Sequence, residues 1–143
     1  MSSGVYVIEL TPVCTSGGIG QATARAFARA GCSVAVHHSS ARSRPIADAL
    51  CAELTTLGVR AAPFAADLST YDAARALYDA VAAAMGPPDL LFSNHGVTGP
   101  RVGPTGDVGA VSAEEFEDIW RTNTGTAFVV GIFLPLILVL ACG

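Results

Sequence analysis

The sequence predicts a doubly wound α/β fold, in which helices cover both faces of a parallel sheet. Apolar strand-like runs alternate with helix-like runs along the first two thirds of the chain. A glycine-rich turn lies between the first strand-like run and the first helix-like run. A glycine also follows each helix-like run, where a left-handed cap commonly ends a helix. We therefore expect three α/β/α layers.

Each element of that fold follows from a local pattern. The strand-like runs are Val5–Leu10, Ser33–Val36, Arg60–Ala65 and Asp89–Ser93. The helix-like runs are Gln21–Ala30, Pro45–Leu57 and Tyr71–Met85. Pro45 suits a first helical turn, since its missing N–H has no partner there. The caps that we expect are Gly31, Gly58 and Gly86.

The last third of the chain begins with a loop and continues as a helix. Residues 96–109 are rich in glycine and follow the fourth strand, at the sheet edge where such folds place ligands. Ser112 and Glu115 form a capping box, so a helix begins near residue 113 and runs through Asn123 toward Pro135. The apolar face of this predicted helix contains Phe116, Ile119 and Trp120.

Composition limits the class of protein. The 143 residues fit one domain, residues 1–143, and 51% of them are hydrophobic. Charged residues make up 14%, with a net charge of −4, which argues against nucleic acid and anionic membrane surfaces as partners. The four cysteines have no metal-like or C-x-x-C spacing, so we expect free thiols in a reducing, cytoplasmic compartment.

The glycine-rich turn is the first candidate binding site. Glycines allow a tight turn, and free N–H groups at a helix start attract phosphate. The turn resembles the T-G-x-x-x-G-I-G pattern of the short-chain dehydrogenase/reductase family, but Val13 and Cys14 stand where that pattern has Thr and Gly. The alternative is a turn that binds nothing. The resemblance implies a Rossmann-like fold and cofactor contacts from Thr15, Ser16, Gly18, Ile19 and Gly20.

The end of the second strand bears on the choice of cofactor. NAD-specific folds place an acidic residue there, but no Asp or Glu occurs from Leu10 to Ala47. Hydroxyls and arginine suit the 2′-phosphate of NADP. We expect NADP, bound by His38, Ser39, Ser40 and Arg42; the alternative is a solvated polar loop. His37 and His38 point to opposite faces of a strand, so we expect no metal site.

Two further strand ends resemble the same family. Asp67 and Leu68 match its Asp-Leu after the third strand, which implies a contact from Asp67 to the adenine amine. The alternative is that Asp67, or Ser69, caps the next helix. Asn94 and Gly96 match its N-N-A-G at the fourth strand, while Ser93 and His95 depart from it. We expect His95 to narrow the cofactor cleft. The alternative is an ordinary strand-to-loop turn.

The predicted helix around Asn123 resembles the family's fifth helix. The resemblance implies that Asn123 is a member of the catalytic tetrad and holds a water that relays protons. Asn is unfavourable within helices, which supports a special role for Asn123. The alternative is a buried, satisfied Asn. The family's helix is also part of a dimer interface, so we expect homo- or hetero-oligomers through residues 113–134.

The rest of the tetrad has no counterpart. The family's hydride transfer uses a Ser and a Tyr-x-x-x-Lys pair, but this sequence has no lysine, no tyrosine after Tyr78 and no serine after Ser112. We expect the NADP(H)-binding portion of a reductase truncated after the fifth helix, resembling 3-oxoacyl-[acyl-carrier-protein] reductases, whose substrates are small carbonyls or alcohols. Alone it would be inactive. The alternative is a non-catalytic module that heterodimerises with full-length relatives.

The apolar tail, residues 128–143, allows three interpretations. It is a misread end of the gene, or the family's helix followed by a shortened strand over Leu136–Ala141, or a membrane tail anchor. The apolar run is shorter than the ~20 residues that a spanning helix needs, and it contains Pro135. These features argue against a membrane partner.

Overall fold

The computed structural model describes residues 5–9, 18–99, 106–132 and 137–139. The chain alternates strands and helices in the order β1 (Val5–Glu9), α1 (Ile19–Arg29), β2 (Ser33–His38), α2 (Arg44–Thr55), β3 (Ala61–Ala65), α3 (Tyr71–Met85) and β4 (Leu90–Ser93). A short 3-10 helix (Val108–Ala110), α4 (Ala113–Trp120), a π turn (Arg121–Gly125), α5 (Thr126–Gly131) and β5 (Ile137–Val139) follow.

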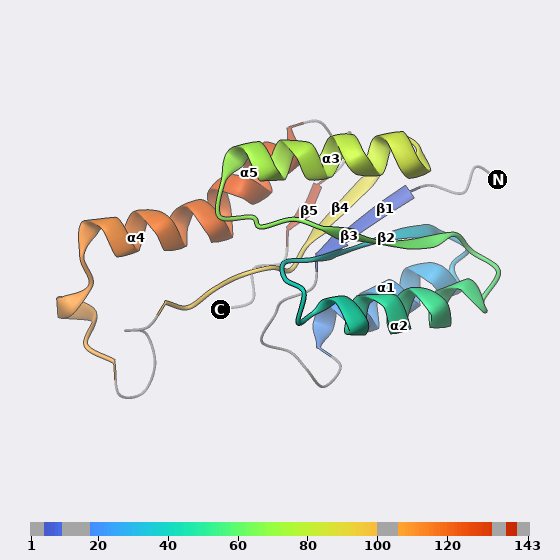
Figure 1. The fold of residues 1–143 in the computed structure, drawn as a ribbon, viewed down its shortest axis with the longest axis horizontal. Coiled ribbons are helices and arrows are strands. Elements are labelled where there is room, and N and C mark those ends of the chain that lie inside the picture. The colour runs from blue at the N-terminus through green and yellow to red at the C-terminus, as the bar shows by residue number, and fades with distance from the viewer. Residues whose placement is uncertain (1–4, 10–17, 100–105, 133–136, 140–143) are drawn as a thin grey trace.

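The strands form one parallel sheet in the order β3-β2-β1-β4-β5. The order reverses at β1, which is the topological switch point of a Rossmann-like fold. Figure 1 shows α1 and α2 on one face of the sheet and α3 and α5 on the other. The predicted fold class is therefore confirmed.

Alternation along the strands divides the core between the two faces of the sheet. Val34 and Val36 pack toward α1 and α2, whereas Ala35 between them packs toward α3. On β4, Phe92 and Leu91 divide in the same way. All five residues are buried, so the central strands are apolar on both sides, as parallel sheets require.

Most of the predicted boundaries hold to within two residues. Gly31, Gly58 and Gly86 have positive φ, a backbone conformation that favours glycine after a helix. β2 runs two residues past its predicted end, through His38, because both histidines join the ladder to β3. The alternative role of Asp67 or Ser69 as the cap of α3 is not found, because Thr70 accepts the hydrogen bond from the Ala73 N–H.

The helix after residue 112 is interrupted where the sequence predicts a continuous one. The capping box is present, because Ser112 and Glu115 each accept the other's backbone N–H. After α4 the chain forms the π turn, in which the Thr126 N–H donates to the Arg121 carbonyl, five residues back. The helix resumes as α5, and β5 then pairs with β4. The tail therefore contains a shortened strand, within the range that the sequence predicts.

Four large apolar side chains are exposed along α4 and α5: Phe116 (58%), Trp120 (46%), Phe128 (67%) and Ile132 (56%). We call them the apolar stripe. Ile119, which the sequence places with Phe116 and Trp120, instead turns inward and lies against Gly99. Among the described residues, no helix is long and apolar enough to cross a bilayer.

Candidate functional site

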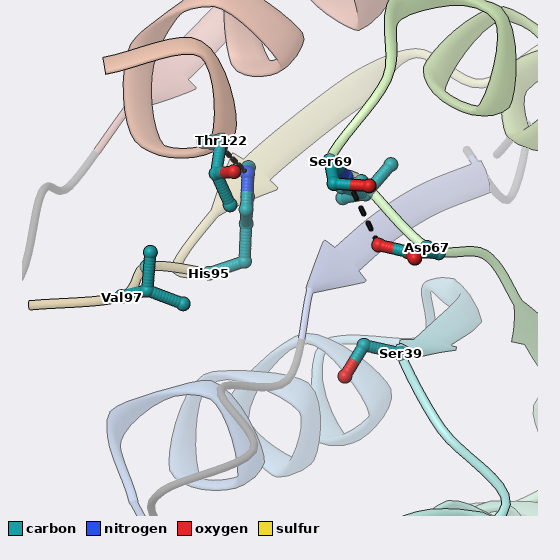
Figure 2. Close-up of a pocket in the computed structure, with 8 residues that line it drawn as sticks. Ser39, Asp67, Ser69, His95, Val97 and Thr122 are labelled. Carbon is teal, nitrogen blue, oxygen red and sulfur yellow. Dashed lines mark hydrogen bonds between the residues drawn. The ribbon is translucent and has the colours of Figure 1, made fainter. Parts of the chain in front are cut away.

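The carboxyl ends of β2, β3 and β4 meet at one edge of the sheet, and two neighbouring cavities open there. The inner cavity, of about 260 Å³, is enclosed by the segments that follow these three strands and by the π turn. Its lining residues are Ser39, Asp67, Leu68, Ser69, His95, Gly96, Val97 and Thr122. Figure 2 draws these eight residues around the cavity and labels six of them. This is the edge at which α/β folds bind ligands.

The outer cavity, of about 460 Å³, lies beside the inner one toward the edge strand β3. Ser39 and Asp67 border both cavities. Its other lining residues are His38, Ser40, Ala41, Arg44, Ala65 and Ala66. Polar groups of both signs therefore surround a space that continues from the inner cavity.

The segment from His38 to Arg44, which we call the β2 loop, is held by its own side chains. The His38 ring donates its Nδ1–H to the Ser40 carbonyl (3.1 Å), since a carbonyl only accepts. The Ser40 and Ser43 hydroxyls lie 3.0 Å apart, and the Ser43 hydroxyl also donates to the Ser40 carbonyl. This network presents Ser39 and Ser40 to the cavities.

The arginine that lines the outer cavity is Arg44, two residues after the predicted Arg42. Arg44, in the first turn of α2, lines the cavity and pairs with Asp48 at 3.3 Å. Arg42 is exposed and is not among the lining residues. The two arginines lie two residues apart in the sequence, which does not show which of them lines the cavity.

The segment after β3 supplies a carboxylate and an apolar floor. Asp67 is exposed, and its Oδ1 accepts the Ser69 N–H at 3.1 Å (Figure 2). Leu68 is buried beneath the inner cavity. Ser69, which the sequence suggested only as a cap, is a lining residue instead. Asp67 borders both cavities and does not cap α3, so its carboxylate can accept from an amine donor there.

His95 is joined to the π turn rather than pointing into the open cavity. Its Nε2 bonds to the Thr122 carbonyl (Figure 2) and lies 3.1 Å from the Thr126 hydroxyl. Its Nδ1 lies 3.3 Å from the Ser93 hydroxyl. Because the Thr122 carbonyl can only accept, the Nε2 atom carries a proton. This hydrogen-bond network of the ring was not predicted from the sequence, and the expected narrowing of the cofactor cleft by His95 stays a prediction.

Asn123 binds the backbone at the same wall. Its Oδ1 accepts the Val97 N–H and its Nδ2 donates to the Val97 carbonyl, both at 2.8 Å. The side chain is half-buried and close to Gly96. We call residues 95–97 together with the π turn the π-turn wall. Asn123 is a satisfied side chain here, and a role in holding a catalytic water stays a prediction.

The glycine-rich turn is described only from its last three residues. Gly18 is the extended N-cap residue of α1, Ile19 is half exposed and Gly20 is buried. Thr15 and Ser16 lie outside the described residues. Gly18 offers no side chain that could cap the first N–H groups of α1, so the start of this helix suits an anion.

Of the two predicted residues at the end of β4, one lines a cavity and the other is buried. Gly96 lines the inner cavity, whereas Asn94 is buried and does not. In the described part of the chain, no group of three or more His, Cys, Asp or Glu side chains could hold a metal. Burial, with Asp48 nearby, raises the pKa of the Cys51 thiol to about 11, so this thiol is protonated at neutral pH.

Comparison with known proteins places this site in context. A family model described as short chain dehydrogenase matches residues 13–138. A protein named short chain dehydrogenase MYCFIDRAFT_6125, from Pseudocercospora fijiensis, is 39% identical over 112 residues, which are 77% of this chain and 33% of that protein.

Two solved structures have the same fold. A blue fluorescent protein from a metagenomic library, in complex with NADPH, superposes with a TM-score of 0.75 at 29% identity, over 89% of this chain and 48% of that one. A short chain dehydrogenase from Burkholderia cenocepacia J2315, in complex with NADP, gives 0.76 at 26% identity, over 92% and 49%. The chain thus spans a third to a half of the length of these proteins.

Proposed function

Because the chain belongs to the short-chain dehydrogenase family, we propose that it binds NADP(H) across the two cavities at the carboxyl edge of the sheet. The observation that carries this proposal is the chemistry of the β2 loop. It brings hydroxyls and the Arg44 guanidinium to the outer cavity, and it contains no carboxylate. Related structures contain NADP or NADPH, which supports the same cofactor here.

The lining residues fit the parts of this cofactor. Arg44, Ser39 and Ser40 would hold the 2′-phosphate, since guanidinium and hydroxyl groups donate to phosphate oxygens. Asp67 would accept from the adenine amine in the inner cavity, above Leu68. The first turn of α1 would face the pyrophosphate. When bound, the cofactor supplies a hydride to a carbonyl in the family's reaction.

A fluorescence titration tests the proposal. The purified chain should bind NADPH more tightly than NADH, because only NADPH has the 2′-phosphate. Arg44→Ala should weaken NADPH binding by about tenfold, the loss of roughly one charge-assisted contact, and leave NADH binding nearly unchanged. Arg42→Ala is the matched control, with the same charge removed from a residue outside the cavity. Equal affinity for both cofactors would contradict the choice of NADP.

We propose further that the chain alone does not turn over substrate. The family's proton donor is a tyrosine whose pKa a lysine lowers, and the sequence contains no lysine. The two tyrosines with described side chains, Tyr71 and Tyr78, both belong to α3. NADPH oxidation with a ketone should stay at the buffer rate. A faster rate, lost on removing the protein, would refute this.

The substrate class and location rest on resemblance. Small carbonyls or alcohols, of the kind that 3-oxoacyl-[acyl-carrier-protein] reductases use, are the substrates that we propose for the parent reaction. The cysteine pattern favours a reducing compartment such as the cytoplasm. A screen of short-chain ketones with a full-length relative would test the first point.

A second candidate function is a binding module that pairs with another family member. The apolar stripe favours it, because large exposed apolar groups on adjacent turns of a helix mark interaction surfaces. We propose self-association or heterodimerisation through residues 113–134. Light scattering should show a dimer, and Phe128→Glu should yield a monomer with the same NADPH affinity.

A further inference from the structure

We propose that His95 is a positioning residue for the cofactor cavity, and that it acts by holding the π turn in the geometry in which Asn123 binds Val97. This inference rests on the proposed NADP(H) function for its effect on affinity, but not for its effect on the wall itself. The family pattern has Ala at this position, whose methyl group has no donor. The contact from residue 95 to the π turn therefore depends on the histidine of this sequence and is not part of the family pattern.

The first step concerns the Thr122 carbonyl. In an α-helix it would accept the N–H of Thr126, four residues later. Here the Thr126 N–H donates to Arg121 instead. The Thr122 carbonyl receives the His95 Nε2–H and, at 2.8 Å, the Thr126 hydroxyl. A side chain that inserts into the hydrogen-bond ladder interrupts a regular α-helix, and His95 occupies the Thr122 carbonyl in this way.

The second step concerns how residues 95–97 and the π turn are held side by side. His95 lies two residues before Val97, and Thr122 lies directly before Asn123. The His95–Thr122 bond and the pair of Asn123–Val97 bonds therefore join the same two short segments side by side. With one of these links removed, the other two have to hold the segments alone. The inner cavity is lined by His95, Val97 and Thr122, so this register shapes the place where the cofactor binds.

The third step concerns the proton on the ring. The Thr126 hydroxyl already donates to the Thr122 carbonyl, so it can only accept from His95. Both contacts of Nε2 therefore require an Nε2–H. In the neutral ring Nδ1 is then an acceptor, which suits the Ser93 hydroxyl. Nitrogen-15 shifts of the imidazole should show the Nε2–H tautomer, and a neutral Nδ1–H ring would overturn the inference without any variant.

A pair of variants separates the donated bond from mere bulk. The amide nitrogen of Gln reaches about as far as Nε2 of His, whereas that of Asn reaches only as far as Nδ1. His95→Gln should therefore keep the Thr122 contact, and His95→Asn should lose it. The readout is the hydrogen exchange rate of the Val97 amide, which Asn123 protects. We expect about tenfold faster exchange in His95→Asn, which corresponds to the loss of about one hydrogen bond, and less than about twofold change in His95→Gln.

Affinity and a control complete the test. NADPH binding should weaken by about tenfold in His95→Asn and stay within about twofold in His95→Gln, following the Val97 exchange. Ser112→Ala is the matched control, since it removes the cap of α4 without touching the wall. It should lower the melting temperature and leave Val97 exchange and affinity unchanged.

Each remaining outcome decides the matter. Unchanged Val97 exchange in His95→Asn, or equal effects of the Asn and Gln variants, would overturn the inference. An effect of Ser112→Ala on Val97 as large as that of His95→Asn would do the same. Failure of the unmodified chain to bind NADPH would refute the proposed function and the affinity effect, while Val97 exchange would still decide whether His95 positions the wall.

Discussion

The β2 loop and the π-turn wall border the same inner cavity, but they are built in opposite ways. The described side-chain hydrogen bonds of the β2 loop join residues two to four positions apart. The bonds that tie the wall together join residues 26 to 31 positions apart. The difference indicates which of the two regions tolerates substitution. In the β2 loop a substitution can alter ligand contacts without affecting other elements, whereas in the π-turn wall it disturbs contacts between distant parts of the fold.

The largest expected effect comes from cutting the wall at Asn123. Asn123→Ala removes two hydrogen bonds and leaves the Val97 peptide group without them. We expect the free energy of unfolding to fall by about 2–3 kcal/mol, given the cost of unsatisfied partly buried groups. Urea unfolding measures this. Asn123→Asp keeps the acceptor of the Val97 N–H and should lose less; equal losses would show that this accepted bond contributes nothing.

The next effect tests how tightly the wall is packed. A Cβ on Gly125 would lie 2.7 Å from the Tyr71 hydroxyl oxygen and 2.8 Å from its ring. Gly125→Ala should therefore cost about 1–3 kcal/mol by overpacking between α3 and the π turn. The double variant with Tyr71→Ala should recover much of that loss relative to Tyr71→Ala alone. Additive losses in thermal unfolding would contradict this contact.

A smaller effect on stability is expected in the β2 loop. Ser43→Ala removes the exposed hydrogen bonds between Ser43 and Ser40. Because water can replace them, the free energy of unfolding should fall by less than about 1 kcal/mol. The preference for NADPH over NADH should fall as well, since Ser40 would lose its orientation. A stability loss as large as that of Asn123→Ala would erase the contrast between the two regions.

The smallest expected effect tests whether separation along the sequence, or burial, makes the hydrogen bonds of the π-turn wall more important for stability than those of the β2 loop. Arg25 and Glu53 join α1 to α2 across 28 residues, through two bonds of 2.8 Å on the surface. The hydrogen bond from Arg25 lowers the pKa of Glu53 below its usual 4.5. The pair therefore stabilises the fold above about pH 4.5 and ceases to do so as the pH falls through the lowered pKa.

A pH series of unfolding measurements tests that pair. Glu53→Gln should be slightly less stable than the unmodified protein at pH 7, and the two should converge at acid pH. High salt should reduce the difference, since the pair is exposed. A difference comparable to that of Asn123→Ala would mean that separation along the chain, rather than burial, makes the wall important.

These contrasts also explain what could be predicted from the sequence. The strands, the helix-ending glycines and the capping box at Ser112 follow from neighbours a few residues apart, so local patterns predict them. The same is true of Ser39 and Ser40 as lining residues. The end of β2 was misjudged because two polar histidines conceal a strand that its neighbour β3 extends.

The parts that were missed depend on distant contacts. Thr122 acts through its carbonyl, so its side chain carries no signal. The π turn has no composition of its own, and its contact with His95 joins it to the distant end of β4. Pro45 indicates where α2 begins, but which arginine lines the outer cavity depends also on Ala65 and Ala66 at the end of β3. No local pattern contains that information.

The π turn has one more consequence, which concerns the phase of the helix surface. Each residue turns an α-helix by about 100°, so the step from Trp120 to Phe128 would rotate the surface by about 80° beyond whole turns. The π turn takes up one residue, which changes that rotation to about −20°. Phe116, Trp120, Phe128 and Ile132 then fall within a sector of about 60° instead of about 160°. The turn beside the cavity thus keeps the apolar groups of α4 and α5 aligned as one surface on the outside of the same helix.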